Sequence, residues 1–291
     1  MPVLLDPALL LQTALSGILL GAVYSLLAGG LNLIFGVMRI INVAHADLMM
    51  LGAYTTFWAF SLLGLNPLLS LLVSMPLLFA LGWGLQRFLV SRVVRASELT
   101  SLLLTFGISI VLVNVALLLW TADFRSVAYL SGSILVGNLA LSKVRLVAFA
   151  VALAITVAVF LFLKWHAWGR AIRATSQHAD LALACGIDVD LVRLGTFGLA
   201  GALAGAAGSL LSMMYSIYPE MGAYFLLKAF AIIILGGRGS FLGAFLGAVI
   251  LGLIESYAAL WTTATHAEAV AYVTLILMLL VRPSGLLGEE E

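Results

Sequence analysis

The feature that most constrains this chain is the recurrence of apolar runs about as long as a membrane is thick. A hydrocarbon layer about 30 Å thick requires about 20 residues of α-helix. Eight segments reach about that length: residues 9–36, 43–63, 67–90, 99–120, 145–164, 194–216, 241–261 and 266–282. A ninth, 225–236, is too short for an unaided crossing. We therefore expect an all-α polytopic membrane protein with about eight full transmembrane helices and one short or broken span.

Charged residues are too scarce to cover a soluble fold. Only 9% of the residues are charged and 64% are hydrophobic, whereas about 25% are charged in an ordinary soluble domain. Lipid removes this difficulty, because the outer face of each helix can stay apolar. No polar stretch is long enough for a second domain, so residues 1–291 are expected to form one transmembrane domain. The net charge of +1 argues against a nucleic-acid partner.

Neither a signal peptide, a disulfide nor a metal site is expected. The first positive residue is Arg39, whereas a secretory signal begins with a basic stretch, so we expect 9–35 to be a retained first span. The single cysteine, Cys185, excludes a disulfide framework within the chain. The histidines, which show no metal-ligand spacing, are His45, His166, His178 and His266.

Positive charges predict the orientation. With the connections 91–98 and 164–193 in the cytoplasm, ten Lys or Arg lie inside and three outside. The ten are Arg39, Arg87, Arg92, Arg95, Lys164, Arg170, Arg173, Arg193, Arg238 and Arg282, and the three are Arg125, Lys143 and Arg145. This bias places the N-terminus outside and the C-terminus inside. An odd number of crossings is then required, so 225–236 is expected to cross.

Two stretches interrupt the apolar pattern with glycine and polar residues. One runs from Gly29 through Gly36 to Asp47, and the other is Gly236-Gly237-Arg238-Gly239-Ser240. Broken spans often line a transporter's pathway, because irregular backbone is tolerated only beside protein or water. The candidates for a translocation pathway or gate are Asn42, His45, Asp47, Gly236 and Gly237. The alternatives are a tight turn at the glycines, and helix-end chemistry with Asn42 as N-cap and Asp47 in the first turn.

Small residues and two buried charges indicate how the helices pack. Glycines four residues apart let helix backbones approach closely in lipid, and these are Gly17 and Gly21, Gly201 and Gly205, and Gly243 and Gly247. Lys228 and Glu255 lie within spans at similar predicted depth. A charge in a span costs about 2.5–3.5 kcal/mol on insertion scales, so we expect the two to pair. A structural pair is favoured over contact with substrate.

The longest polar interruption, 164–193, is predicted to be a cytoplasmic loop that docks onto a partner. Its part from Arg170 to about Cys185 predicts an amphipathic helix, and Gly186 suits the position after its end. Such a helix lies on lipid headgroups or docks onto a protein, and the few basic residues favour the protein. The chain has no phosphate-binding G-x-x-x-x-G-K-[ST] motif, so energy for transport would have to arrive through a docked surface. The alternative for the loop is a solvated connector.

Four motifs resemble those of a known family. Residues 180–186, D-L-A-L-A-C-G, resemble the E-A-A-x-x-x-G loop by which permeases of ABC importers engage their ATPases, although Asp and Leu replace Glu and Ala. Residues 42–54 resemble I-N-F-A-H-G-E…M-x-G-A-Y, with departures at Val43, Ala46 and Asp47. Residues 228–240 resemble K-A-F…L-G-G-x-G-S, and residues 282–286 resemble R-P-x-G-L. Together these motifs resemble the branched-chain amino acid permeases of bacteria, of the LivH type.

The resemblance implies one permease in a larger machine in the bacterial cytoplasmic (inner) membrane. Its partners would be a periplasmic substrate-binding protein, a second and homologous permease subunit, and two cytoplasmic ATPases that bind ATP and Mg, with no cofactor in this chain. The family carries mainly leucine, isoleucine and valine, and relatives carry other amino acids, amides or urea. The residues expected at the ATPase are Ala179, Leu183, Gly186 and Ile187, with Asp180 at the rim.

The sequence gives less support to two other classes of function. An ion-coupled secondary transporter would require more membrane-embedded carboxylates than Asp47 and Glu255 provide. An intramembrane enzyme would require a catalytic motif, and neither H-E-x-x-H nor G-x-S-x-G occurs in the chain. We therefore expect a transport subunit and not an enzyme.

Overall fold

The computed structural model describes residues 6–94, 96–137, 139–281 and 285–287. Each apolar segment predicted from the sequence forms a helix with bounds within a few residues of those expected. The helices are α1 (Pro7–Met38), α2 (His45–Leu63), α3 (Leu71–Phe88), η2 (Val90–Arg92), α4 (Glu98–Trp120), α5 (Lys143–Trp165), α6 (Ala167–Gln177), α7 (Ala179–Ala184), α8 (Val189–Leu211), α9 (Met221–Gly236), α10 (Phe241–Trp261) and α11 (Ala264–Val281).

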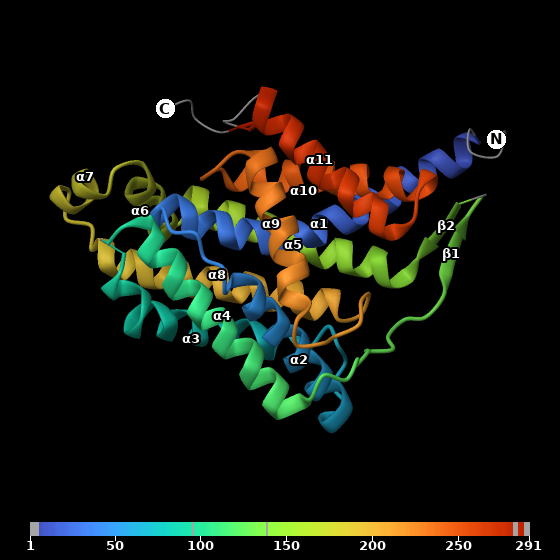
Figure 1. Cartoon of the computed structure of the whole chain (residues 1–291), viewed down its shortest axis with the longest axis horizontal. Helices are drawn as coiled ribbons and strands as arrows, with labels where there is room; N and C mark the ends of the chain where they lie inside the picture. The colour runs from blue at the N-terminus through green and yellow to red at the C-terminus, as the bar shows by residue number, and fades with distance from the viewer. Residues whose placement is uncertain (1–5, 95, 138, 282–284, 288–291) are drawn as a thin grey trace.

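Seven of the described helices have the length and apolar composition to cross a membrane, so the protein is a multi-pass membrane protein. They are α1, α2, α3 together with η2, α4, α5, α8 and α10. The 16-residue α9 is shorter, as the sequence predicts, and Figure 1 shows that it runs steeply across the direction of α1 and α8. The number of crossings and the orientation stay predictions.

One element departs from the all-α expectation. Strands β1 (Ser133–Val136) and β2 (Leu139–Ser142) form an antiparallel hairpin in the connection between α4 and α5. The hairpin extends from one end of the helical bundle, whereas α6 and α7 lie at the opposite end (Figure 1). All four residues of β1 are exposed, and the hairpin lies at an end of the bundle and not along it, so a strand pair is compatible with a membrane fold there. These two ends are called the hairpin end and the α6–α7 end below.

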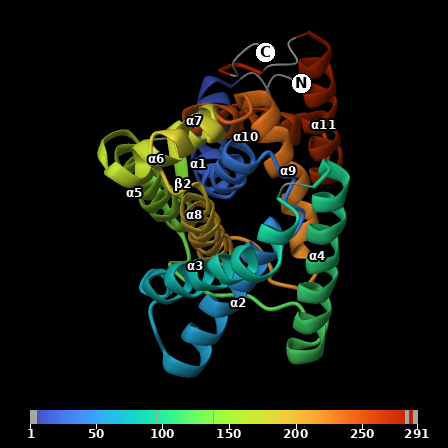
Figure 2. The ribbon, with the colours of Figure 1, turned by 90° about the vertical axis from the view of Figure 1, so that its left-hand side faces the viewer.

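Helix α1 is the centre of the bundle. It contacts α5, α8, α9 and α10, and Figure 2, which looks from the α6–α7 end, shows these helices grouped around it. The predicted span 9–36 is confirmed as one helix, because α1 runs without a break through Gly29 and Gly36 over 32 residues and the irregular backbone begins only at Arg39. Gly30 faces the His45 ring and the backbone of Ala200, and Gly36 faces Gly239. These glycines therefore provide room for neighbours and do not interrupt the helix.

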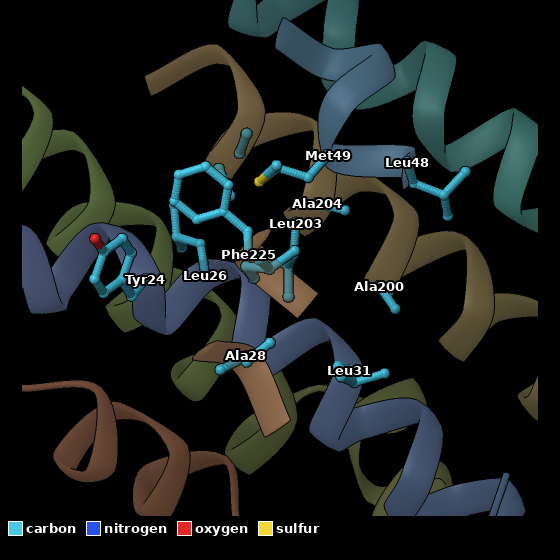
Figure 3. Packing of buried hydrophobic residues seen from close by; sticks show 14 of the residues in the cluster. Tyr24, Leu26, Ala28, Leu31, Leu48, Met49, Ala200, Leu203, Ala204 and Phe225 are labelled. Carbon is cyan, nitrogen blue, oxygen red and sulfur yellow. The ribbon is translucent and has the colours of Figure 1, made fainter. Parts of the chain in front are cut away.

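The six glycines predicted to pack helices all lie where two helices approach closely. A Cβ atom on Gly17 or Gly21 would lie 2.7 Å or 2.5 Å from a carbonyl oxygen of α10. The other four face neighbouring backbones in the same way, Gly201 and Gly205 against α3, and Gly243 and Gly247 against α9. Between these contacts, side chains fill the core, as Figure 3 shows for Leu26 of α1, Met49 of α2, Leu203 of α8 and Phe225 of α9.

Gly208 of α8 offers a direct test of this packing. A Cβ there would overlap the backbone of α2 at Met49 and Ala53. We expect Gly208→Val to destabilise the folded protein by about 1–3 kcal/mol or more, because the two helices must separate. Gly84→Val is the matched control, since no atom lies within 4 Å of its Cβ position in α3. Thermal unfolding in mild detergent measures the difference, and equal melting temperatures would contradict the packing.

Candidate functional site

The chain turns back into the bundle after α1. We call residues 39–44 the re-entrant segment; it begins at Arg39, which ends α1 with a φ of 53°. His45, the first residue of α2, places its Nε2 atom 3.0 Å from the carbonyl oxygen of Leu27. About 16 Å of helix separate Leu27 from Met38 at 1.5 Å per residue. Helix α2 therefore begins well inside the bundle and not at its end.

The re-entrant segment is held by a threonine of α4. The Thr105 hydroxyl donates to the carbonyl of Ile41 over 3.0 Å and accepts from the Val43 N–H over 3.2 Å. Non-helical backbone at membrane depth needs such partners, because lipid offers none. Thr105 could not be predicted from the sequence, since a single threonine in an apolar span is common and gives no sign of which helix it faces.

Asn42 and His45 are buried at the start of α2. The prediction that Asn42 caps α2 is wrong, because Ala44 occupies the N-cap position. Val43 and Ala44 lie between Asn42 and the first residue of α2. The Asn42 side chain is therefore too far along the chain from the first turn to cap it. Neither polar atom of the Asn42 side chain has a hydrogen-bond partner, nor does Nδ1 of His45. Buried polar atoms without partners are uncommon in a structure and are often found at functional sites.

The Asp47 carboxylate lies between two helix N-termini. Asp47 occupies the first turn of α2, as predicted, and is 3% exposed. Its Oδ1 atom also lies against Gly222, in the first turn of α9, where any side chain would collide with it. The positive ends of both helix dipoles favour a negative charge there. The role of Gly222 could not be predicted from the sequence, because only the fold brings α9 to α2.

A polar face continues along α2. Asp47, Tyr54 and Trp58, which we call the α2 polar face, are spaced seven and four residues apart and so lie on one side of the helix. Each has one buried polar atom without a hydrogen-bond partner: Oδ2, the hydroxyl and Nε1. The Tyr54 ring stacks on Trp120 of α4 at 4.1 Å between centroids. This face therefore contacts α4 at Tyr54 and α9 at Asp47.

Of the other predicted pathway residues, Gly236 is the last residue of α9 and Gly237 begins the tight turn that leads to α10. The Asn32 side chain of α1 holds this turn by donating to the carbonyls of Gly237 and Ser240 and accepting from the Gly239 N–H. Asn32 and Gly30, which faces His45, are about 200° apart around α1. The structure therefore does not bring the two predicted sets together, and the tight-turn interpretation describes the second set.

The end of α9 is completed by a distant segment. The backbone N–H groups of Leu286 and Leu287 donate to the carbonyls of Leu235 and Gly236 over 2.9 Å and 3.0 Å. Leu286 is the last residue of the motif at 282–286, of which Arg282, Pro283 and Ser284 lie outside the described residues. The glycine at 285 has a φ of 76° and packs against the α9 backbone.

Lys228 and Glu255 form an ion pair between α9 and α10. The Lys228 Nζ lies 2.5 Å from a carboxylate oxygen of Glu255 and 3.4 Å from the Tyr24 hydroxyl of α1. It also lies 4.4 Å from the ring centroid of Tyr224. The Tyr24 hydroxyl in turn lies 3.0 Å from that of Tyr215. The pair thus joins three helices at a depth where an isolated charge would be costly.

This geometry predicts how charge removal affects folding. We expect Lys228→Met or Glu255→Gln alone to destabilise by about 3–5 kcal/mol, because each leaves a buried charge without its partner. The double variant should be less destabilised than either single one. Asp190→Asn is the control, since its carboxylate is 74% exposed in its ion pair with Arg193 and should contribute little. Equal yields and melting temperatures for both single variants and the double variant would argue against a structural pair.

The predicted docking helix is two helices. The expectation of one helix from Arg170 to about Cys185 is wrong, because the chain becomes extended at His178, with φ −148° and ψ 101°. This break begins a new helix with Asp180 in its first turn, where the dipole favours a negative charge. Gly186 follows α7 with a φ of 82°, in the left-handed region that suits a glycine after a helix.

The five predicted docking residues differ in exposure. Asp180, Leu183 and Gly186 are exposed, whereas Ala179 and Ile187 are half-buried. Leu181, which sequence analysis did not single out, is 62% exposed beside Leu183 at 61%. Helix α7 therefore presents an apolar surface at the end of the molecule (Figure 1). Within the residues that the structure describes, no three His, Cys, Asp or Glu side chains are placed to hold a metal ion.

Comparison with known proteins agrees with the motifs. Residues 13–281 match the family described as branched-chain amino acid transport system / permease component. The high-affinity branched-chain amino acid transport system permease proteins LivH of Salmonella typhimurium and BraD of Pseudomonas aeruginosa are each 31% identical, over 97% of this chain and 96% of theirs. A probable LivH of Methanocaldococcus jannaschii is 30% identical over 90% of this chain and 88% of its own. No solved structure matches. The chain belongs to the family of branched-chain amino acid transport system permease components.

Proposed function

We propose that the chain is the membrane-spanning permease subunit of an ATP-driven importer for branched-chain or related hydrophobic amino acids. A periplasmic binding protein would deliver the amino acid at the hairpin end. A second, homologous permease subunit would complete the passage in the cytoplasmic membrane, and two ATP-binding subunits would drive it from the α6–α7 end. The names of the relatives and the length of their match support this assignment.

The observation that carries the proposal is the α6–α7 surface. Leu181 and Leu183 are exposed beyond the bundle while Ala182 between them is buried, so α7 is packed on one side and open on the other. Large exposed apolar side chains at a polar end of a molecule indicate a protein contact. An ATPase docked there would supply energy to a chain that has no phosphate-binding motif of its own.

Movement of the docked helices would reach the spans through close contacts. Gly169 of α6 packs directly on the backbone of α5 at Phe162 and Leu163. Arg170 and Arg173 donate to the carbonyls of Trp165 and Lys164 at the end of α5. A displacement of α6 would therefore carry the end of α5 with it.

The passage itself is proposed to follow the α2 polar face. A zwitterionic amino acid needs a polar partner for its ammonium group and an apolar wall for its side chain. Asp47 provides a carboxylate at the start of this face, and the unpartnered atoms of Tyr54 and Trp58 continue it. Asn42 and His45 in and beside the re-entrant segment would close the passage at the α6–α7 side, since irregular backbone can move without breaking a helix.

Leu183 provides the first test. We expect Leu183→Asp to abolish co-purification of an ATP-binding subunit from native membranes in mild detergent, because a charge would be buried at the contact. Leu135→Asp is the matched control, since Leu135 is 74% exposed in the hairpin at the opposite end. Transport in the same membranes should stop when ATP is depleted while the membrane potential is held. Absence of any ATP-binding partner from the wild type, together with transport driven by the potential alone, would identify an ion-coupled transporter instead.

Asp47 tests the passage. We expect Asp47→Asn to reduce amino acid uptake about tenfold or more, because a charged hydrogen bond of about 1.5–3 kcal/mol to the ammonium group is lost. Glu98→Gln is the control, since Glu98 lies in the first turn of α4 but is exposed. The amount of assembled complex should stay the same in both variants. Normal uptake by Asp47→Asn would exclude this residue from the passage.

A further inference from the structure

A cavity of about 380 Å³ lies at the α6–α7 end, and no residue of α2 lines it. It is enclosed by α1, α5, α6 and the turn between α9 and α10. The residues that line it are Asn32, Leu33, Gly36, Val37, Phe160, Leu163, Lys164, Ile172, Arg173, Ser176, Gly239, Ser240, Phe241 and Leu242. Apolar side chains form most of the wall, and two cations contribute to the rest.

The cavity lies at the depth of lipid headgroups, whichever way the protein faces. Lys164 is in the last turn of α5, a span of 23 residues. Trp165, the final residue of α5, is 65% exposed, and tryptophan is enriched at the boundary between hydrocarbon and water. Phe160 and Leu242, which are 37% and 48% exposed, mark the edge of the cavity toward the apolar surface of the bundle. The cavity thus meets hydrocarbon on one side and the polar boundary on the other.

The charges around this cavity have one sign. Lys164 and Arg173 line it, and no carboxylate is among the described residues that do so. The Arg173 guanidinium donates to the carbonyl of Lys164 over 3.1 Å, which holds it beside the lysine. Two cations from two neighbouring helices therefore line one opening.

A second cavity at the same end provides a comparison. It measures about 330 Å³ and contains Arg87 and Arg193, but it also contains Asp190. Arg193 and Asp190 form an ion pair at 3.1 Å. One of the two positive charges of the second cavity is therefore paired with a carboxylate that lines it, whereas no carboxylate lines the first among the described residues.

We propose that the first cavity binds the phosphate headgroup of an anionic phospholipid from the membrane, with Lys164 and Arg173 as the phosphate ligands and Phe160 and Leu242 alongside the acyl chains. Lysine and arginine pair with phosphate oxygens through charge-assisted hydrogen bonds, and the apolar edge accommodates lipid tails that a soluble phosphate lacks. Ser176 and Ser240 add hydroxyl groups to the same wall. The site is separate from the α2 polar face and does not depend on the transport function.

A lipid in this position would contact α5, α6 and α10 together. Its headgroup would bridge the end of α5 and α6, and its tails would lie beside the start of α10. Since α6 precedes the docking helix α7, an anionic lipid would stabilise the arrangement in which α6 rests against α5. The stability of this end of the protein would then depend on lipid charge.

Binding to the purified, delipidated full-length chain tests the site. The probes are phosphatidylglycerol and phosphatidylcholine with the same acyl chains, titrated in mild detergent and counted by native mass spectrometry. We expect phosphatidylglycerol to be retained more strongly, and Arg173→Ala to weaken it about fivefold, with a further fivefold loss on adding Lys164→Ala, because each basic residue near an anionic lipid contributes about that factor.

Arg170→Ala is the matched control. Arg170 is on the same helix and also donates to a carbonyl at the end of α5, that of Trp165, but it does not line the cavity. It should retain phosphatidylglycerol like the wild type. Equal binding of the two lipids by the wild type, or equal losses in Arg170→Ala and Arg173→Ala, would overturn the proposal. Displacement of phosphatidylglycerol by glycerol 3-phosphate at similar concentration would also overturn it, since the ligand would then be a soluble phosphate.

Discussion

Close approach of helix backbones around α1 is the constraint on which the rest of this structure depends. In lipid, apolar side chains gain little by turning from the bilayer to a neighbouring helix, so association depends on contact area and packing. Gly17 and Gly21 bring α10 against α1, and Gly52 and Gly205 bring α2 against α8. The irregular segments beside α1 are then held in place by hydrogen bonds to this helix.

Two irregular segments bind α1 at positions that lie within one and a half turns of each other. On one side, the Leu27 carbonyl receives His45 and so fixes the depth at which α2 begins. On the other side, Asn32 closes the turn between α9 and α10. Helix α9 connects the two sides, because its first turn meets Asp47 and its last turn leads into the Asn32 contact. A tilt of α9 against α1 would therefore alter both places together.

Features that depend only on the order of residues along the chain could be predicted from the sequence. The lengths of apolar runs located the helices, and the similar depth of Lys228 and Glu255 anticipated their contact. Features that depend on which helices pack against each other could not be predicted from the sequence. Thr105 and Gly222 are ordinary residues until the fold places them beside the re-entrant segment and Asp47. The break at His178 was missed for the same reason, since helix propensity describes local preference and tertiary contacts override it.

The backbone contact between residues 285–287 and the end of α9 has a consequence for biosynthesis. The carbonyls of Leu235 and Gly236 emerge from the ribosome well before Leu286 and Leu287, their eventual partners. Until then α10 and α11 must be inserted beside a helix whose end is incomplete, with its carbonyls dependent on water or on the insertion machinery. The end of α9 therefore reaches its final conformation only after residues 285–287 have been synthesised, later than α9 itself.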